Sequence, residues 1–207
     1  RPARSWGGSP ATPRPRGCIS VVRPSPGPQG AGSNRENPSW WAPPDHAIGR
    51  SRGGLTCKVH LVSDGKGRPL SWAVTAGNIN DTTMLSTVLD GIRVPRLGPG
   101  RPRTRPDRVL ADKGYPSKAN RAWLRARGIA ATIPEREDQI AHRAKKPGRP
   151  IDFGAEQQQR YRGRNVVERC FNKLKQWRGI AMRTDKLARN YRAAIALAAT
   201  LIWLRST

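Results

Sequence analysis

The chain has 207 residues, and its 39 lysines and arginines exceed its 14 aspartates and glutamates to give a formal net charge of +25. A charge of this size favours a polyanionic partner such as nucleic acid, although it does not separate an enzyme from a ribosomal or nucleoid-type binding protein. Three cysteines without a paired spacing exclude a disulfide framework and a Cys-x2-Cys zinc site, so the cytoplasm is the expected compartment.

The first 44 residues differ from the rest in composition. Residues 1–44 hold 10 of the 19 prolines, with glycine, serine and arginine between them. Such a segment buries too little apolar surface to fold, so we expect it to be disordered or irregular, except for a short strand over 18–22. Residues 45–207 are the expected folded domain.

A hairpin opens this domain. Residues 55–62 and 69–75 are rich in strand-forming side chains and are joined by a glycine-rich turn, which predicts two antiparallel strands. Strand alternation sends Cys57 and His60 to opposite faces, so we expect no metal site between them.

Helical spacing of apolar residues follows the hairpin. Residues 82–89 form a predicted helix, with Asn80 or Asp81 as its N-cap. A basic loop then leads to the apolar run 108–111, which ends at Asp112. This pattern is typical of a strand that presents a carboxylate at its C-terminal edge.

The next predicted elements are a helix over 118–127, ended by Gly128, and a strand over 129–133. A polar basic loop is expected from there to a last pair of helices. The apolar stretch 191–204 is too short for a membrane span and ends at Arg205, so it predicts a buried core helix.

The most informative segment spans 161–175. Its residues Tyr161, Arg164, Glu168 and Lys175 recur at spacings of three, four and seven, which on one helix places them within about 60° of arc. The opposite side is apolar, with Val166, Val167, Cys170, Phe171, Leu174 and Trp177. Spacing alone fits equally an ordinary amphipathic helix with a solvated charged face.

The segment 161–175 and the Asp112-x-Gly-Tyr pattern together resemble the DDE transposases of bacterial insertion sequences, in the insertion-sequence four/five group. The resemblance implies an α/β fold of the RNase H-like type, with a mixed sheet flanked by helices. It also implies Asp112 and Glu168 as catalytic residues and metal ligands. Arg164 and Lys175 would hold DNA phosphates, and Tyr161 would contact DNA or pack beside the site.

The same resemblance implies partners and chemistry. The expected activity is DNA strand cleavage and strand transfer by phosphoryl transfer, assisted by Mg²⁺ or Mn²⁺. The expected partners are double-stranded DNA at the inverted repeats of an insertion sequence and a target DNA, with a homodimer in the DNA complex. No membrane is expected, and the protein would be associated with the nucleoid.

One expected residue has no match. The resemblance implies a first catalytic aspartate on a strand before the hairpin, but the only candidate strand, 19–22, is followed by Arg23 and Pro24. As substitutes, Asp64 fits a turn better and Asp81 fits a helix cap better. Two carboxylates hold a metal pair poorly, so we expect a degenerate copy with impaired activity.

We interpret residues 1–44 as partly out of frame, in a chain that is N-terminally truncated or frameshifted. Two alternatives to a transposase stay open: a basic DNA-binding remnant without catalysis, and a structural RNA-binding protein. The tripeptides Gly-Arg-Pro at 100–102 and 148–150 resemble AT-hook cores, but both lack the preceding arginine and fit phosphate-binding loops better.

Overall fold

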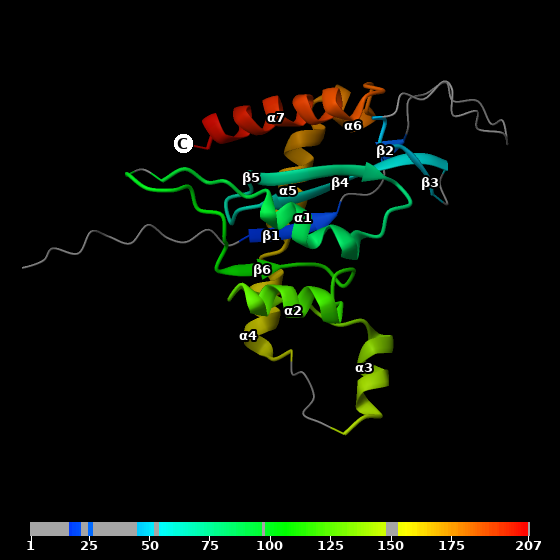
Figure 1. Cartoon of the computed structure of the whole chain (residues 1–207), viewed down its shortest axis with the longest axis vertical. Coiled ribbons are helices and arrows are strands. Elements are labelled where there is room, and N and C mark those ends of the chain that lie inside the picture. The colour runs from blue at the N-terminus through cyan, green and yellow to red at the C-terminus, as the bar shows by residue number, and fades with distance from the viewer. Residues whose placement is uncertain are drawn as a thin grey trace, which may run out of the picture.

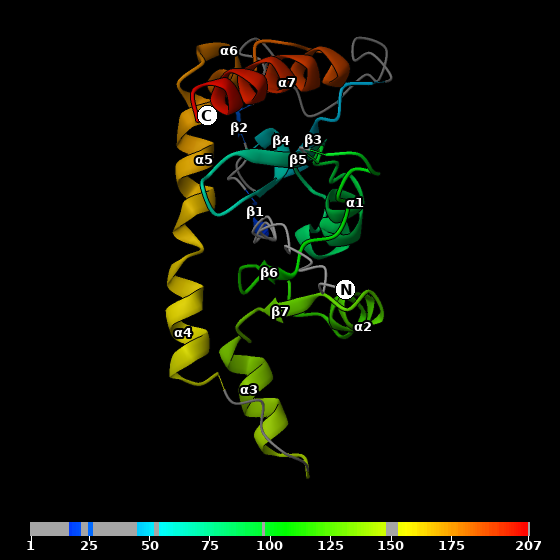
Figure 2. The ribbon, with the colours of Figure 1, turned by 90° about the vertical axis from the view of Figure 1, so that its left-hand side faces the viewer.

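A computed structural model of the chain describes residues 17–21, 25–26, 45–51, 54–96, 98–147 and 153–206. It contains a mixed sheet with helices packed against it (Figure 1, Figure 2). The strands are β1 (Gly17–Val21), β2 (Ser25–Pro26), β3 (Gly49–Ser51), β4 (Gly54–Ser63), β5 (Pro69–Ala76), β6 (Arg108–Leu110) and β7 (Ala130–Thr132). The helices are η2 (Asp81–Met84), α1 (Leu85–Asp90), α2 (Lys118–Ala126), α3 (Glu137–Ala144), α4 (Ala155–Arg162), α5 (Asn165–Lys175), α6 (Arg178–Met182) and α7 (Ala188–Leu204).

The sheet joins an antiparallel half to a parallel half. β4 pairs antiparallel with β5 and with β1, whereas β6 pairs parallel with both β1 and β7. β2 and β3 add short antiparallel pairs to β4. The central order is therefore β5–β4–β1–β6–β7, and the mixed α/β class expected from the sequence is confirmed.

The predicted hairpin is confirmed as β4 and β5. Cys57 and Leu61 face one core, while His60 and Val62 are buried on the other side, as alternation requires. The turn is held by Asp64, whose Oδ1 accepts from the backbone N–H groups of Lys66 and Arg68, both at 2.9 Å. Asp64 is thus a turn residue, as its position predicts.

Each face of the sheet has its own apolar core. One core packs residues of β4 and β5 against α5, α6 and α7. The other packs Val62 and Val109 against α1 and α2. Figure 2 shows α5 on one side of the sheet and α1 and α2 on the other. β6 contributes to both cores, through Leu110 to the first and Val109 to the second.

The helix signals after the hairpin are also confirmed. Asn80 is the N-cap of η2, and its Oδ1 accepts from Thr82 N at 3.1 Å. Gly128 follows α2 with a φ of 63°, a left-handed conformation that favours glycine. At the C-terminus, α7 buries one face through Ala188, Tyr191, Ile195, Ala198, Ala199 and Ile202. None of the described helices has the length and apolar character needed to cross a bilayer.

The prediction of a loop between β7 and the Glu168 helix is wrong, because the helices α3 and α4 lie there. Neither helix buries a single residue, so the apolar periodicity that identifies a helix is absent. Charges stabilise them instead. α3 begins with Glu137 and Asp138 and ends with basic residues, which complements the helix dipole, and Glu156 pairs with Arg160 in α4.

A buried arginine ties the start of the domain to its C-terminal helices. Arg183 is fully buried with a φ of 44°, and its guanidinium donates to the carbonyl oxygens of His46 and of Ala47. Nearby, Asp45 accepts from the first N–H groups of α7, those of Ala188 and Arg189. The segment 45–48 is therefore held against α6 and α7.

Of the predictions for residues 1–44, the structure confirms the short strand. β1 overlaps the single strand that the sequence allows in residues 1–44, and β2 is a two-residue strand in the same segment. Arg23, Pro24 and the rest of that segment lie outside the described residues. The Gly-Arg-Pro tripeptide at 148–150 also lies outside them.

Candidate active site

Asp112 stands just beyond the C-terminal end of β6. The strand is held between β1 and β7, and Ala111 N donates to Thr132 O at 3.3 Å. The chain then turns, because Tyr115 N donates to Asp112 O at 3.0 Å and Lys113 N donates to Asp112 Oδ1 at 2.7 Å. The half-buried carboxylate is thus presented at the sheet edge, as the sequence predicts.

A polar clamp holds the turn after Asp112. Thr82 Oγ1 donates to Gly114 O at 2.8 Å, and Asn120 Nδ2 donates to the carbonyl oxygens of Thr82 and Tyr115, at 2.9 and 3.2 Å. Threonine and asparagine side chains at helix starts often bond local backbone in this way. The first turn of α2 and the start of η2 therefore fix the loop that carries Asp112, a role that the sequence alone did not reveal.

Tyr115 is the apolar anchor of the same turn. Its ring is 2% exposed and lies in the core beneath α1 and α2. Burial raises the pKa of the Tyr115 hydroxyl far above its ordinary value, and the negative charges of Asp81 and Asp112 raise it further. The phenol therefore stays neutral and serves packing.

The segment 161–175, which lies in α4 and α5, contacts Asp112. Tyr161 Oη lies 3.1 Å from Asp112 Oδ1 and donates to it. The Arg164 guanidinium lies 5.5 Å from the centre of the Tyr161 ring and pairs with Glu168 Oε1 at 3.2 Å. Two motifs that are separated by about fifty residues in sequence thus form one chain of contacts from Asp112 to Glu168.

The prediction of one continuous helix over 161–175 is wrong. α4 ends at Arg162 and α5 begins at Asn165, and between them Arg164 N bonds Tyr161 O, and Val166 N bonds Gly163 O, in tighter three-residue turns. A Cβ on Gly163 would lie 3.1 Å from Arg160 O and 3.8 Å from the Leu110 side chain. Glycine therefore avoids a tight contact with Arg160 O at the junction.

Tyr161 consequently belongs to a different helix from Glu168. Its ring is oriented by the junction and packs edge-on against Phe153 with centroids 5.9 Å apart. The apolar side predicted for the helix is found in α5, where Val167, Cys170, Phe171 and Leu174 are buried. Burial raises the pKa of the Cys170 thiol to about 12, so this cysteine is a packing residue rather than a nucleophile.

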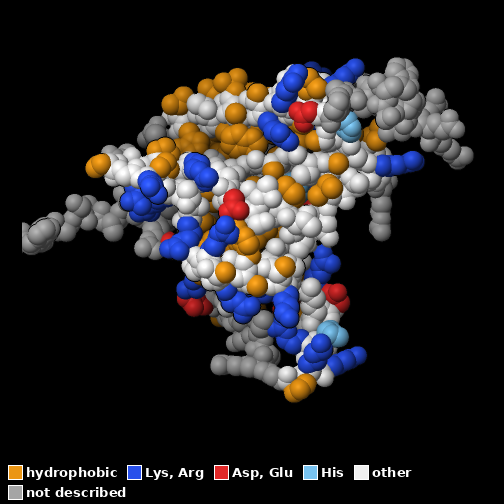
Figure 3. All heavy atoms as spheres, viewed as in Figure 1, with side chains coloured by type: hydrophobic (Ala, Val, Ile, Leu, Met, Phe, Trp, Pro, Cys, Tyr) orange, Lys and Arg blue, Asp and Glu red, His pale blue; other side chains and the backbone are white. Residues whose placement is uncertain are grey.

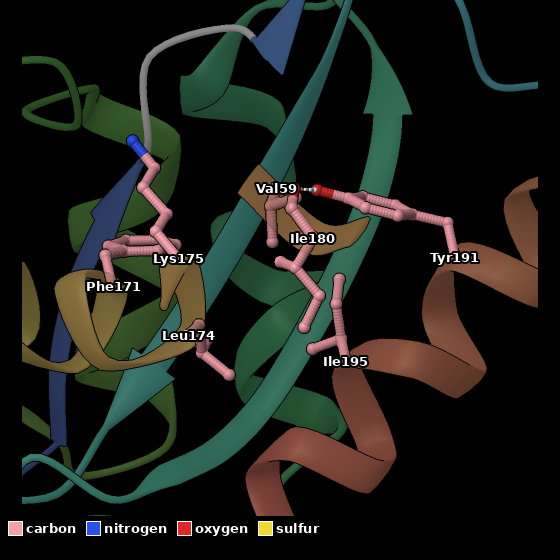
Figure 4. Close-up of a pocket in the computed structure, with 7 residues that line it drawn as sticks. All are labelled: Val59, Phe171, Leu174, Lys175, Ile180, Tyr191 and Ile195. Atoms are coloured by element: carbon pink, nitrogen blue, oxygen red, sulfur yellow. Dashed lines mark hydrogen bonds between the residues drawn. The ribbon is translucent and has the colours of Figure 1, made fainter. Parts of the chain in front are cut away.

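Lys175 lies apart from this chain of contacts. It follows Glu168 by two helical turns, about 10 Å along the axis at 1.5 Å per residue. Its side chain helps to line a small apolar pocket formed by Val59, Phe171, Leu174, Ile180, Tyr191 and Ile195. Figure 4 shows the Lys175 nitrogen directed away from the other labelled residues. Its stem therefore packs while its charge stays accessible.

The carboxylate oxygens of Asp112 and Glu168 are the donor type that a hard divalent cation prefers. Among the described residues, no three histidines, cysteines, aspartates or glutamates are grouped as a metal site. The two proposed substitutes are engaged elsewhere: Arg68 pairs with Asp64 at 2.6 Å, and Lys58 pairs with Asp81 at 2.9 Å. In its described part, the chain thus offers two carboxylates of the right chemistry and no third.

Comparison with known proteins identifies the class. The chain belongs to the transposase DDE domain family, whose model matches residues 22–203. It is 32% identical to a putative transposase for insertion sequence element IS6501 of Brucella ovis, over 152 residues that make up 73% of this chain and 100% of that protein.

A second relative matches over a shorter length. It is a putative transposase for insertion sequence element IS402 of Burkholderia cepacia, 43% identical over 79 residues, which are 38% of this chain and 37% of that protein. The chain thus spans a little over a third of this relative and the whole of the first. Both relatives and the family model confirm the resemblance to the DDE transposases of bacterial insertion sequences, a family whose domains generally use divalent metal ions.

Proposed function

We propose that this chain acts in DNA transposition, binding double-stranded DNA at insertion-sequence ends, with Asp112 and Glu168 as the catalytic carboxylates. The observation that carries the proposal is the chain of contacts Asp112–Tyr161–Arg164–Glu168. It joins the two motifs at the C-terminal edge of β6. We also propose a target DNA and a homodimer in the DNA complex.

We assign the fold to the RNase H-like type. The support is the sheet itself, in which the antiparallel strands β5, β4 and β1 continue into the parallel strands β6 and β7, with helices on both faces. In this arrangement Asp112 leaves the strand next to β1, and α5 brings Glu168 to the same side. We assign the catalytic domain to residues 45–207, completed by β1.

A Mg²⁺ or Mn²⁺ ion would be held by Asp112 and Glu168. When bound, such an ion stabilises charge on the oxygens of a reacting phosphate. Arg164 already neutralises part of the Glu168 charge, and its planar guanidinium suits phosphate as well as carboxylate. Tyr161 orients Asp112 through its hydroxyl, and the exposed ammonium of Lys175 is placed to contact phosphate further along the DNA.

We further propose that cleavage by this chain is weak. β1 is the neighbour of β6 and pairs Cys18 with Leu110, so its next residues lie level with the end of β6 and Asp112. The strand sequence Gly17–Val21 contains no acidic residue. The strand beside Asp112 therefore supplies no carboxylate, and two carboxylates hold a pair of metal ions less firmly than three.

The test is nicking of a duplex that carries the inverted repeats flanking the gene, measured in Mn²⁺ and in Mg²⁺. We expect slow, metal-dependent nicking that Glu168→Gln and Asp112→Asn both abolish. Glu156→Gln is the matched control, because Glu156 is an exposed α4 carboxylate that pairs with Arg160, and it should nick at the unaltered rate. Equal nicking by Glu168→Gln and the unaltered chain would contradict the assignment.

A second function is favoured by the lack of a third carboxylate among the described residues: a DNA-binding remnant without catalysis. It predicts salt-sensitive duplex binding with no nicking in either metal. Competition with structured RNA separates both from an RNA-binding protein, because a DNA-directed chain should prefer the duplex ends.

A further inference from the structure

The segment between α1 and β6 forms an ordered, arginine-rich hairpin. Val94 and Arg103 exchange both backbone hydrogen bonds, at 2.9 and 2.8 Å, and so pair the two arms. We call residues 93–105 the arginine hairpin, of which all but Leu97 are described. Figure 1 shows it as the green loop that projects from the left of the sheet before β6.

The hairpin carries charge of one sign. Residues 91–106 contain five arginines and no aspartate or glutamate, which gives +5 over sixteen residues. These arginines are Arg93, Arg96, Arg101, Arg103 and Arg105. All but Arg103 are exposed, and Figure 3 shows lysine and arginine side chains gathered on this side of the molecule. The hairpin is therefore a concentrated positive surface.

Carboxylates neutralise basic side chains elsewhere in the described structure, as in the pairs Arg68–Asp64, Arg160–Glu156 and Arg164–Glu168. In the hairpin, the guanidinium groups of Arg93 and Arg105 bond backbone carbonyls. Arg93 donates to the carbonyls of Asp90 and Ile92, both at 2.7 Å, and Arg105 donates to that of Arg127 at 2.9 Å. These bonds orient the side chains and leave their charge for a partner.

The backbone of the hairpin selects the kind of partner. Prolines at positions 95, 99, 102 and 106 lack N–H donors, so the arms cannot extend a neighbouring sheet. Gly100 has a φ of 128°, which keeps the exposed tip in a conformation that other residues rarely adopt. A preformed, positive surface without strand-pairing capacity fits a polyanion rather than a protein edge.

The hairpin lies at the opposite end of β6 from Asp112. Asp107 and Asp112 are five positions apart, a span of about 16 Å at about 3.3 Å per residue. Each strand of duplex DNA advances 3.4 Å per phosphate, so that span corresponds to about five base pairs. Arg127, which follows α2, stacks on Trp123 at 3.9 Å and pairs with Asp90 at 3.1 Å, so it borders the hairpin without adding free charge to it.

We propose that the arginine hairpin binds the sugar–phosphate backbone of duplex DNA outside the catalytic centre, about five base pairs from the phosphate held near Asp112. This inference rests on the proposed function for the identity of the polyanion. The hairpin acts as a second contact site for the duplex and sets its orientation across the sheet. The carboxylates at the other end of β6 face the reacting phosphate.

The test compares two pairs of substitutions that remove the same charge. Arg96→Ser with Arg101→Ser alters the hairpin, and Arg189→Ser with Arg192→Ser alters exposed positions on α7. Duplex affinity is measured by fluorescence anisotropy from 50 to 200 mM salt. Each lost phosphate contact lowers the slope of log K against log salt by about 0.9, so the hairpin pair should lower it by about 1.8 and weaken binding by at least tenfold near 0.1 M salt.

A charge-preserving variant guards against misfolding. Arg96→Lys with Arg101→Lys should keep the slope, because a slope counts charges rather than guanidinium forks. Equal slopes for the hairpin and α7 pairs, with duplex binding intact, overturn the hairpin proposal alone. Loss of slope in the lysine variant also overturns it. Failure of the unaltered chain to prefer duplex DNA over structured RNA overturns the proposed function and the hairpin proposal together.

Discussion

His60 makes the stability of this protein depend on pH in a calculable way. The side chain lies in β4 with no exposed surface, its Nε2 is 2.8 Å from Thr75 Oγ1, and its buried Nδ1 has no partner within the described residues. Burial lowers the pKa of the imidazole from 6.5 to about 4; the Asp81 charge raises it in part and the Lys58 charge lowers it. The folded protein therefore holds His60 neutral.

The sign follows from comparing the folded and unfolded states. Below pH 6.5 the unfolded chain binds a proton at His60, whereas the folded chain does not until about pH 4. The contribution of neutral His60 to the free energy of unfolding is complete above pH 6.5 and is lost as the pH falls from 6.5 to about 4. The difference of 2.5 pKa units amounts to about 3 kcal/mol at about 1.36 kcal/mol per unit, most of it lost by pH 4.5.

The assay is urea unfolding of the unaltered chain and of His60→Gln at a series of pH values from 7.5 to 4.5. The carboxylates titrate in both proteins, so their effect cancels in the difference. We expect the free energy of unfolding of the unaltered chain, relative to that of His60→Gln, to fall by about 2.5 kcal/mol over this range. His142→Gln, at an exposed position, is the control for the loss of a histidine. A difference that stays constant with pH would refute the reasoning.

Three further substitutions test packing and clamping, each by urea unfolding. Gly77→Ala should cost about 1–3 kcal/mol, because the new Cβ would lie 2.9 Å from a carbonyl oxygen of β4, and an unchanged stability would contradict this close approach. Arg183→Met should cost about 3 kcal/mol by removing a buried cation from two carbonyls, whereas exposed Lys186→Met should cost less than about 0.5 kcal/mol. Asn120→Ala should cost about 1–2 kcal/mol by releasing the clamp after Asp112, and a loss equal to that of exposed Asn190→Ala would argue against the clamp.

Local pattern was enough to predict the elements with a buried face. β4 and β5 are rich in strand-forming residues and flank a glycine-rich turn, and α5 repeats apolar residues at helical spacing, so all three elements were predictable from the local sequence. The position of Asp112 after β6 followed from an apolar run ending in a carboxylate. A segment that buries side chains carries apolar residues in a recognisable pattern, and these segments carry such a pattern.

The remaining features depend on contacts that spacing does not encode. α3 and α4 bury no residue, so their sequences resemble loops. The helix breaks at Gly163, where an added Cβ would lie 3.1 Å from Arg160 O, a close approach that the spacing of side chains does not encode. Lys175 keeps the predicted helical side of Glu168, but it lies two turns away beside an apolar pocket. The contact of Tyr161 with Asp112 likewise required the tertiary structure.

The placement of β1 bears on how the chain assembles. β1 joins the two halves of the sheet, because it pairs with β4 on one side and with β6 on the other. β4 does not pair with β6 in the described structure. The β4–β5 hairpin can close locally as soon as it is synthesised, but β1 has both neighbours only when residues 108–110 arrive, some ninety positions after β1. We therefore expect an early intermediate in which β1 is paired with the β4–β5 hairpin but keeps its other edge open, exposed to aggregation until β6 docks. A change in the first strand thus acts on assembly as well as on chemistry.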